Sequence, residues 1–295
     1  MDAKELEALI KLLDDSDAEI YRHVEDRILS LGSEVIPALE KTWENTLDIL
    51  LQQRIEELIH KIQFGVVKHE LQTWAVSGAF DLLKGFLIVS RYQYPELDEQ
   101  KIINQIEAIK RDAWIELRYD TSPVEKVKIL NHVIYNMHGF TGNVTNYNDP
   151  QNSYLNIVME SRRGNQISMA IVYSVIAQML DIPVYGVNLP QHFILAYIDE
   201  ANDYQDLHDH QQGILFYINA FNKGFIFNKR DVDYFLKQLN VQAHPSFYQP
   251  CSNIQIIKRV LRNLINSYEK LGATEKQTEV QLMYNVLNEI EGEDI

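Results

Sequence analysis

The sequence predicts an α+β fold, in which helices occupy the first half of the chain and a small antiparallel sheet comes after a buried helix. Apolar residues recur at helical spacing over roughly the first 160 residues. Residues 166–180 are apolar on nearly every side, which is typical of a helix buried all round. Three runs rich in Val, Ile, Phe and Tyr come next and favour strands. A buried helix leading into antiparallel strands is an α+β arrangement.

The N-terminal residues predict short amphipathic helices. One apolar stripe ends at the acidic turn 14–17, a second covers residues 20–29, and Pro37 lies in the first turn of a third helix, where its missing N–H costs little. Residues 9–39 resemble a HEAT-type repeat. A single repeat cannot bury its own face, so we expect it to stack on the next helices of the chain. An ordinary helical cap would give the same pattern.

The next hundred residues continue the helical pattern and end in a loop. Helices are predicted over Phe80–Arg91, Ile102–Leu117 and Val124–Met137, and a stretch rich in Gly and Asn comes after them at 139–150. Asn165 is placed to cap the buried helix that begins at the next residue.

Strands are predicted over Val184–Leu189, Phe193–Ile198 and Ile214–Phe221, with a fourth at Gly224–Asn228. Residues 253–290 then predict two helices around the turn Leu271–Ala273. This pair is compatible with a tetratricopeptide-like hairpin or with a plain helical pair, because one unit shows no period.

Composition excludes several classes of protein. The chain has 295 residues and a formal net charge of −15, with no basic run, so we expect no nucleic-acid or membrane-surface binding. Its most apolar stretch, 167–180, is too short to span a membrane. The N-terminus lacks the pattern of a signal peptide, and the single cysteine, Cys251, excludes an internal disulfide. We therefore expect a cytoplasmic protein.

Several phrases in the middle of the chain occur together in a recognisable order. They are Arg91–Asp98, Gly139–Asn143, Asn152–Asn156, Glu160–Ser168, Asp181–Val187, Leu189–Phe193 and Ile218–Asn222. Together they closely resemble the SirB-type family of transglutaminase-like proteins, over roughly residues 81–224. The resemblance implies a papain-type core with a buried central helix and a small antiparallel sheet.

The resemblance also implies three catalytic positions, and the first of them has lost its chemistry. The cysteine position of active members falls on Gln166, whose amide offers no ionisable nucleophile. His192 occupies the place of the general base, and Asn219 the place of the group that orients it. An amide can still orient an imidazole, but it cannot replace a thiol.

Two other residues carry a hydroxyl or thiol that could act as a nucleophile. Ser168 lies two positions after Gln166 on the same helix, rotated by about 200°, so it should face away from His192. A lone cysteine such as Cys251 is more often an inert apolar residue than a nucleophile. The sequence therefore favours a protein that is not an enzyme and needs no cofactor.

Further side chains have two interpretations each. His192 is either a strand histidine satisfied by a backbone partner or a remnant of a cleft that now binds something. Arg163 is expected to anchor its loop through Glu160 or Asp149, although solvated surface charge fits as well. The loop Asp203–His210 collects carboxylates and imidazoles, but its spacing matches no zinc pattern, so we expect no metal site.

The leading hypothesis is a non-catalytic scaffold that holds a protein or peptide in the former active-site groove. The expected groove residues are Arg162, Arg163, Gly164, Asn165, Gln166, His192 and Asn219. The alternative is a hydrolase or acyltransferase with an unorthodox nucleophile. Three segments are expected: HEAT-like helices at 1–64, a transglutaminase-like core at 65–245 (helical lead-in 65–160, central helix and sheet 161–245), and a helical hairpin at 246–295.

Overall fold

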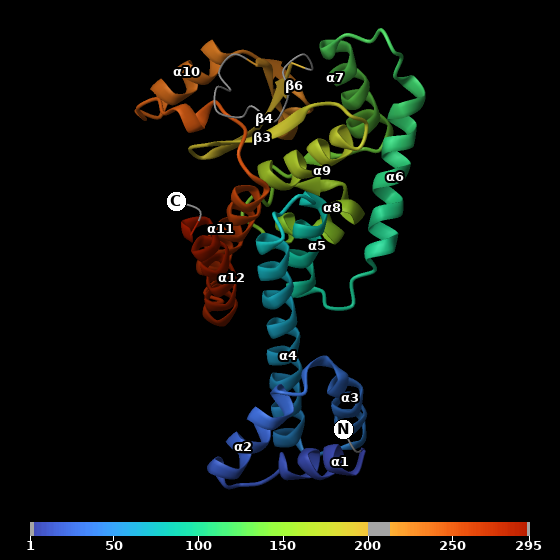
Figure 1. Ribbon diagram of the computed structural model, residues 1–295, viewed down its shortest axis with the longest axis vertical. Coiled ribbons are helices and arrows are strands. Elements are labelled where there is room, and N and C mark those ends of the chain that lie inside the picture. The colour runs from blue at the N-terminus through green and yellow to red at the C-terminus, as the bar shows by residue number, and fades with distance from the viewer. Residues whose placement is uncertain (1–2, 200–212, 294–295) are drawn as a thin grey trace. The chain divides into compact units, whose positions relative to one another are not determined.

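The computed structural model describes residues 3–199 and 213–293, and the chain divides into two compact units (Figure 1). The first unit is Met1–Thr73 and the second is Trp74–Ile295. The loop 203–210, at which the sequence predicts no metal site, lies outside the described residues. No described helix is long and apolar enough to cross a membrane.

The first unit consists of helices packed on a core of their own. They are α1 (Ala3–Leu12), α2 (Ala18–Leu29), α3 (Ile36–Asn45) and the first part of α4 (Ile49–Val76), with a 3-10 turn at Gly32–Val35. The Asp17 carboxylate caps α2, and Pro37 lies in the first turn of α3 as predicted. Leu13, Ile28, Leu39, Ile55 and Leu58 are fully buried in one cluster.

The second unit begins with a helical layer. It contains α5 (Leu82–Gln93), α6 (Glu99–Glu116), α7 (Pro123–Asn131) and α8 (Leu155–Ser161). The predicted helix over Val124–Met137 changes at His132 into a π-helical turn that ends at Met137. Periodicity does not reveal this widening, because a single π-helical turn at the end of a helix is too short to show a period of its own.

The central helix is α9, Gln166–Gln178, and almost all of it is buried, as its all-round apolar sequence predicts. The side chain of Asn165 accepts a hydrogen bond from the Ser168 amide and caps the helix. Just before it, the two-residue strands β1 (Thr141–Gly142) and β2 (Arg163–Gly164) pair in parallel. This pairing fixes the loop from which Gln166 emerges.

The sheet contains four antiparallel strands in chain order. They are β3 (Val184–Leu189), β4 (His192–Ile198), β5 (Ile214–Asn219) and β6 (Phe225–Phe227). One face packs on α9, and the other carries Val187, Ile194 and Tyr217 against α10 (Lys229–Gln238) (Figure 1). The α+β class is therefore confirmed.

Two long helices close the chain. They are α11 (Asn253–Leu271) and α12 (Thr274–Glu293), joined at Gly272, and they lie side by side (Figure 1). Gly272 adopts φ 69°, the left-handed conformation common at helix C-termini. Leu261 and Leu264 of α11 and Leu287 of α12 are buried, whereas Tyr284 is half-buried.

Candidate functional site

The structure brings Gln166 and His192 into direct contact. The side-chain amide nitrogen Nε2 of Gln166 lies 2.8 Å from Nδ1 of the imidazole. The amide oxygen Oε1 accepts a hydrogen bond from the backbone N–H of Phe193, at 3.3 Å. Both ends of the carboxamide are thus engaged by the first two residues of β4. His192 therefore has a side-chain partner rather than a backbone partner.

Two local features bring the first turn of α9 to the start of β4. Pro190 and Gln191 form the two-residue turn between β3 and β4, and Gln191 adopts φ 61°. The pairing of β4 with β5 begins at Leu195 opposite Ile218, so β5 does not reach Phe193. The Gln166 amide oxygen satisfies the Phe193 N–H that the neighbouring strand leaves open.

The surroundings of His192 favour its neutral form. Its ring packs edge-on against Phe235 of α10, with centroids 4.6 Å apart. Burial, together with the positive charge of Arg259, lowers the pKa of His192 below its ordinary value of 6.5. Arg259 in turn donates to the Asn188 side chain, at 3.1 Å. An imidazole in this setting stays uncharged at neutral pH.

Asn219 does not join this pair. It ends β5, and its side-chain oxygen accepts from the Asn222 amide at 3.0 Å, which caps the next 3-10 turn, Ala220–Asn222. In the described part of the chain, no hydrogen bond links Asn219 to His192. The sheet register puts Asn219 near Ile194, on the same face as His192.

The loop before Gln166 is held in place by buried residues and by backbone pairing. Gly164 and Asn165 are buried, and the side-chain nitrogen Nδ2 of Asn165 donates to Ser153 Oγ at 2.9 Å. The guanidinium of Arg162 lies over the Phe140 ring, 4.8 Å from its centroid. Arg163 is exposed. The backbone pairing of β1 with β2 therefore anchors this loop.

The anchoring role predicted for Arg163 is wrong. Within the described ranges, Arg163 forms no ion pair with Glu160 or Asp149. Arg163 pairs with Thr141 of β1 through its backbone, and its side chain is exposed. An ion pair at the surface would cost this side chain conformational entropy and would gain little energy in return.

Neither alternative nucleophile faces the imidazole. Ser168 is fully buried, and its hydroxyl donates to the Asn165 side-chain oxygen at 3.1 Å; among the described residues it forms no hydrogen bond with His192. Cys251 lies beyond α10 at the edge of β3, where its backbone N–H donates to the Gly186 carbonyl. Burial raises the pKa of the Cys251 thiol to about 12, so almost no thiolate exists at neutral pH.

Sequence reasoning missed Arg259, Phe235 and Tyr147. The charge of Arg259 affects the pKa of both His192 and Tyr147, so one guanidinium lies near both side chains. The available signal was a group of three cations on one predicted helix, at 258, 259 and 262, in an acidic chain. Helix α10 was missed because it is largely polar, although Asn228 and Asp231 form a capping box that marks its start.

Comparison with known proteins places this site in a family. The profile of the transglutaminase-like superfamily matches residues 100–262, which is more than half of the chain and includes Gln166, His192 and Asn219. The chain belongs to the transglutaminase-like superfamily.

Relatives of this superfamily member occur in bacteria and in animals. A UPF0162 protein of Xylella fastidiosa strain Temecula1 is 29% identical over 208 residues, covering 63% of this chain and 64% of the relative. A UPF0162 protein of strain 9a5c is 33% identical over 121 residues, or 39% and 41%. F-box only protein 21 of Mus musculus is 31% identical over 147 residues, or 50% and 22%.

The matches thus span less than two thirds of these relatives' own lengths. The comparison with solved structures found no match to this chain. Among the described residues, no three His, Cys, Asp or Glu side chains gather in a way that could hold a metal ion.

Proposed function

We propose that this chain is a non-catalytic transglutaminase-like protein that binds a protein or peptide segment at the surface around Gln166 and His192. The observation that supports this most directly is the hydrogen bond between Gln166 Nε2 and His192 Nδ1, at 2.8 Å. A carboxamide nitrogen is not a nucleophile, because its lone pair is delocalised into the carbonyl. The imidazole is therefore paired with a group that it cannot activate.

The alternative enzyme requires another hydroxyl or thiol beside the imidazole, and no specific observation favours one. The Ser168 hydroxyl donates to Asn165, and Cys251 is a half-buried thiol whose pKa is raised to about 12. Gln166 and His192 can therefore hold each other in place while the surface around them binds a partner.

Exposed apolar side chains next to the site support binding of a partner. Tyr147 is 40% exposed and Val144 77% exposed, on the loop after β1. The Tyr147 ring packs edge-on against Phe221, with centroids 5.9 Å apart, and Phe221 in turn covers Gly142. Aromatic side chains at the surface give a large contact area at low entropic cost, so they favour a role in recognition.

The comparisons support a modular role. The mouse F-box only protein is matched over 22% of its length, so the shared region there is one part of a larger protein. We extend the proposal to SirB-type membership, to a cytoplasmic location, and to HEAT-like and tetratricopeptide-like helices beside the core. The activity and partners of the whole protein belong to the proposal as well.

Affinity capture from a cytoplasmic lysate tests the proposal. Proteins retained by the parent chain should be lost with both His192→Ala and Tyr147→Ala. Tyr119→Ala serves as the matched control, because Tyr119 is a fully exposed tyrosine between α6 and α7. Identical retained sets for all four proteins would leave the surface without a role. Labelling by a serine- or cysteine-directed activity probe that disappears with His192→Ala would instead support the enzyme.

A further inference from the structure

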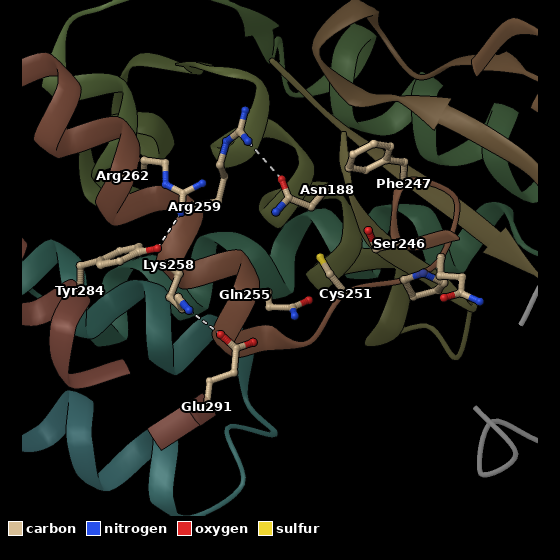
Figure 2. A pocket seen from close by; sticks show the side chains of 12 residues that line it. Asn188, Ser246, Phe247, Cys251, Gln255, Lys258, Arg259, Arg262, Tyr284 and Glu291 are labelled. Carbon is tan, nitrogen blue, oxygen red and sulfur yellow. Dashed lines mark hydrogen bonds and ion pairs between the residues drawn. The ribbon is translucent and has the colours of Figure 1, made fainter. Parts of the chain in front are cut away.

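A pocket lies beside α11, and its walls are unusually basic for this chain. It has a volume of about 450 Å³, and Lys258, Arg259 and Arg262 of α11 line it together with one carboxylate, Glu291 (Figure 2). The whole chain carries a formal net charge of −15. Three cations facing one carboxylate is therefore a local reversal of the charge that dominates the rest of the sequence.

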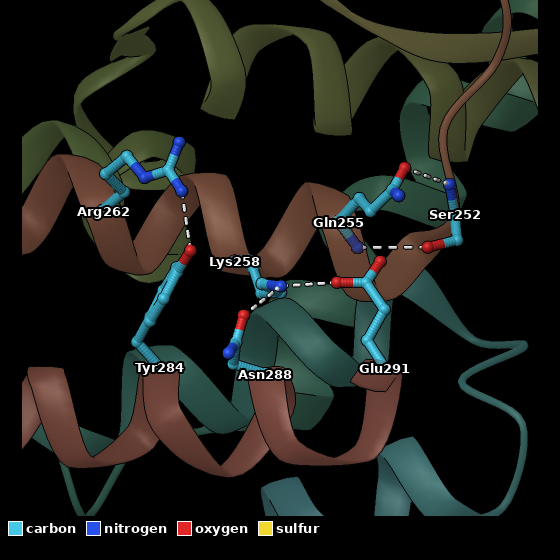
Figure 3. A network of polar contacts seen from close by, with 7 residues as sticks. All are labelled: Ser252, Gln255, Lys258, Arg262, Tyr284, Asn288 and Glu291. Carbon is cyan, nitrogen blue, oxygen red and sulfur yellow. Dashed lines mark hydrogen bonds and ion pairs between the residues drawn. The ribbon is translucent and has the colours of Figure 1, made fainter. Parts of the chain in front are cut away.

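The single carboxylate is already neutralised. Glu291 of α12 forms an ion pair with Lys258, which also donates to Asn288 at 3.0 Å (Figure 3). Lys258 and Glu291 thus satisfy one another across the two helices. The charge that remains in the pocket belongs to the two arginines.

Among the described residues, the hydrogen-bond partners of both arginines are neutral. Arg262 donates to the Tyr284 hydroxyl at 2.6 Å, and Arg259 donates to the Asn188 side chain at 3.1 Å (Figures 2 and 3). Within residues 3–199 and 213–293, neither guanidinium forms an ion pair. A guanidinium has five N–H donors, so most donors of each remain open to a ligand.

The two guanidinium groups are also close enough to repel one another. Burial and, next, the positive charge of Arg262 lower the pKa of Arg259. Two like charges held near one another without a counter-ion are stabilised when an anion binds between them. Guanidinium groups suit carboxylate and phosphate in particular, because their planar N–H pairs match two oxygens at once.

The remaining walls suit a small organic molecule. Phe247 and Tyr284 supply apolar surface, while Ser246 and Gln255 supply neutral polar groups (Figure 2). The volume lies within the range of small-molecule sites, roughly 300–1,000 Å³. We propose that this pocket binds a small organic anion whose carboxylate or phosphate group is held by Arg259 and Arg262.

Titration of the full chain at low ionic strength tests the proposal, with inorganic phosphate and succinate as the two probes and glycerol as the neutral control. Calorimetry measures affinity, and ¹H–¹⁵N spectra follow the Nε–H signals of Arg259 and Arg262. We expect saturable binding of at least one anion with shifts of both signals, and no response to glycerol. Phosphate binding alone would assign a phosphate ester, and succinate binding alone a carboxylate.

Matched variants separate the pocket from general attraction of anions to positive charge. Arg262→Gln changes an exposed residue, so it should keep the fold and weaken binding by roughly tenfold or more. Arg118→Gln removes the same charge from an exposed position between α6 and α7, and it should leave the affinity unchanged. Arg259→Gln should also weaken binding, with circular dichroism to verify the fold.

His192→Ala should retain anion binding, which keeps this result independent of the proposed protein-binding surface. Absence of saturable binding with both anions would overturn the proposal. Equal losses in Arg262→Gln and Arg118→Gln would overturn it as well, because the attraction would then be a property of net charge.

Discussion

The carboxamide of Gln166 determines which nitrogen of His192 carries the proton. The backbone N–H of Phe193 is a donor, so it must face the amide oxygen, and the amide NH₂ then faces the imidazole. Nδ1 of His192 is therefore an acceptor, and the ring proton lies on Nε2. Protonating the ring would set a donor against a donor. The hydrogen-bond network thus opposes the imidazolium, in agreement with the effects of burial and of Arg259.

The first prediction concerns the titration of His192. Its pKa should lie below 6.5, and its ¹³C and ¹⁵N shifts should report the neutral form with the proton on Nε2 at pH 7. The unfolded chain binds the proton more tightly than the folded chain between the two pKa values. The free energy of unfolding should therefore rise with pH through this window, and fall as the solution is acidified from pH 7.

His192→Gln removes this titration and serves as the comparison. Urea denaturation at several pH values should show the parent losing stability relative to the variant as the pH falls through about 6.5. A difference that stays constant with pH would contradict a lowered pKa.

The second prediction places a thiol beside the imidazole. Gln166 is the first residue of α9, where the helix N-terminus stabilises an anion, and its side chain contacts His192. Gln166→Cys should therefore react with iodoacetamide at pH 7 roughly tenfold faster than Cys251 of the parent chain does, since the pKa of Cys251 is about 12.

Adding His192→Ala to Gln166→Cys should slow the reaction. Mass spectrometry of the modified peptide distinguishes the introduced thiol from Cys251. If the introduced thiol reacts no faster than Cys251, with or without His192, Gln166 does not occupy the position from which this fold's chemistry acts.

At the residue scale, the sequence motifs predict that Gln166 and His192 lie close together, because the residues around them mark the start of a helix and the start of a strand. The same motifs do not predict the role of Asn219. Its side chain has two possible tasks, to orient the imidazole or to cap the turn at Asn222, and only the backbone geometry after β5 decides for the cap.

At the scale of elements, the sequence predicts the strands that have a clear apolar pattern and does not predict those that are too short to show one. The residues of β3 coincide with the predicted strand, and β4 begins one residue earlier than expected. The strands β1 and β2 have two residues each, too short for an alternating pattern. Their pairing depends on backbone hydrogen bonds across a long loop, which the sequence pattern does not record.

The third prediction concerns the tight entry into α9. A Cβ added at Gly164 would lie 2.4 Å from Ser168 Oγ, inside the packed core. Gly164→Ala should therefore lower the free energy of unfolding by about 1–3 kcal/mol, as overpacking does. Ser168→Ala alone removes hydrogen bonds to Asn165 and should cost about 1 kcal/mol.

Combining the two substitutions isolates the contact. The double variant Gly164→Ala, Ser168→Ala should be less destabilised than the sum of the single variants, because the clashing oxygen is absent. Urea denaturation measures all four free energies. If the effects of the two substitutions on the free energy of unfolding simply add, the added Cβ does not clash with Ser168 Oγ, and this contact is not the reason that glycine is required at position 164.

At the scale of the whole molecule, the candidate surfaces belong to one unit. Gln166, His192 and the basic pocket all lie within Trp74–Ile295, whereas Leu39 belongs to the separate core of Met1–Thr73. The family profile likewise begins at residue 100. The boundaries predicted at 64/65 and 245/246 remain predictions.

The fourth prediction is that the two cores unfold separately. Leu39→Ala removes a fully buried side chain from the first unit and should destabilise that unit by about 2–5 kcal/mol. Scanning calorimetry should show one transition moving to lower temperature. The shifts of His192 should stay unchanged, because its contacts with Gln166 and Phe235 lie in the second unit.

Val187→Ala provides the matched change in the second unit, where Val187 is fully buried on the α10 face of the sheet. It should move the other transition and leave the first in place. Helix α4 runs through Thr73, but a helix gains most of its stability from packing, so its two ends need not melt together. If either substitution moved both transitions equally, the two cores would form one cooperative unit, and changes in the first would alter binding at the second.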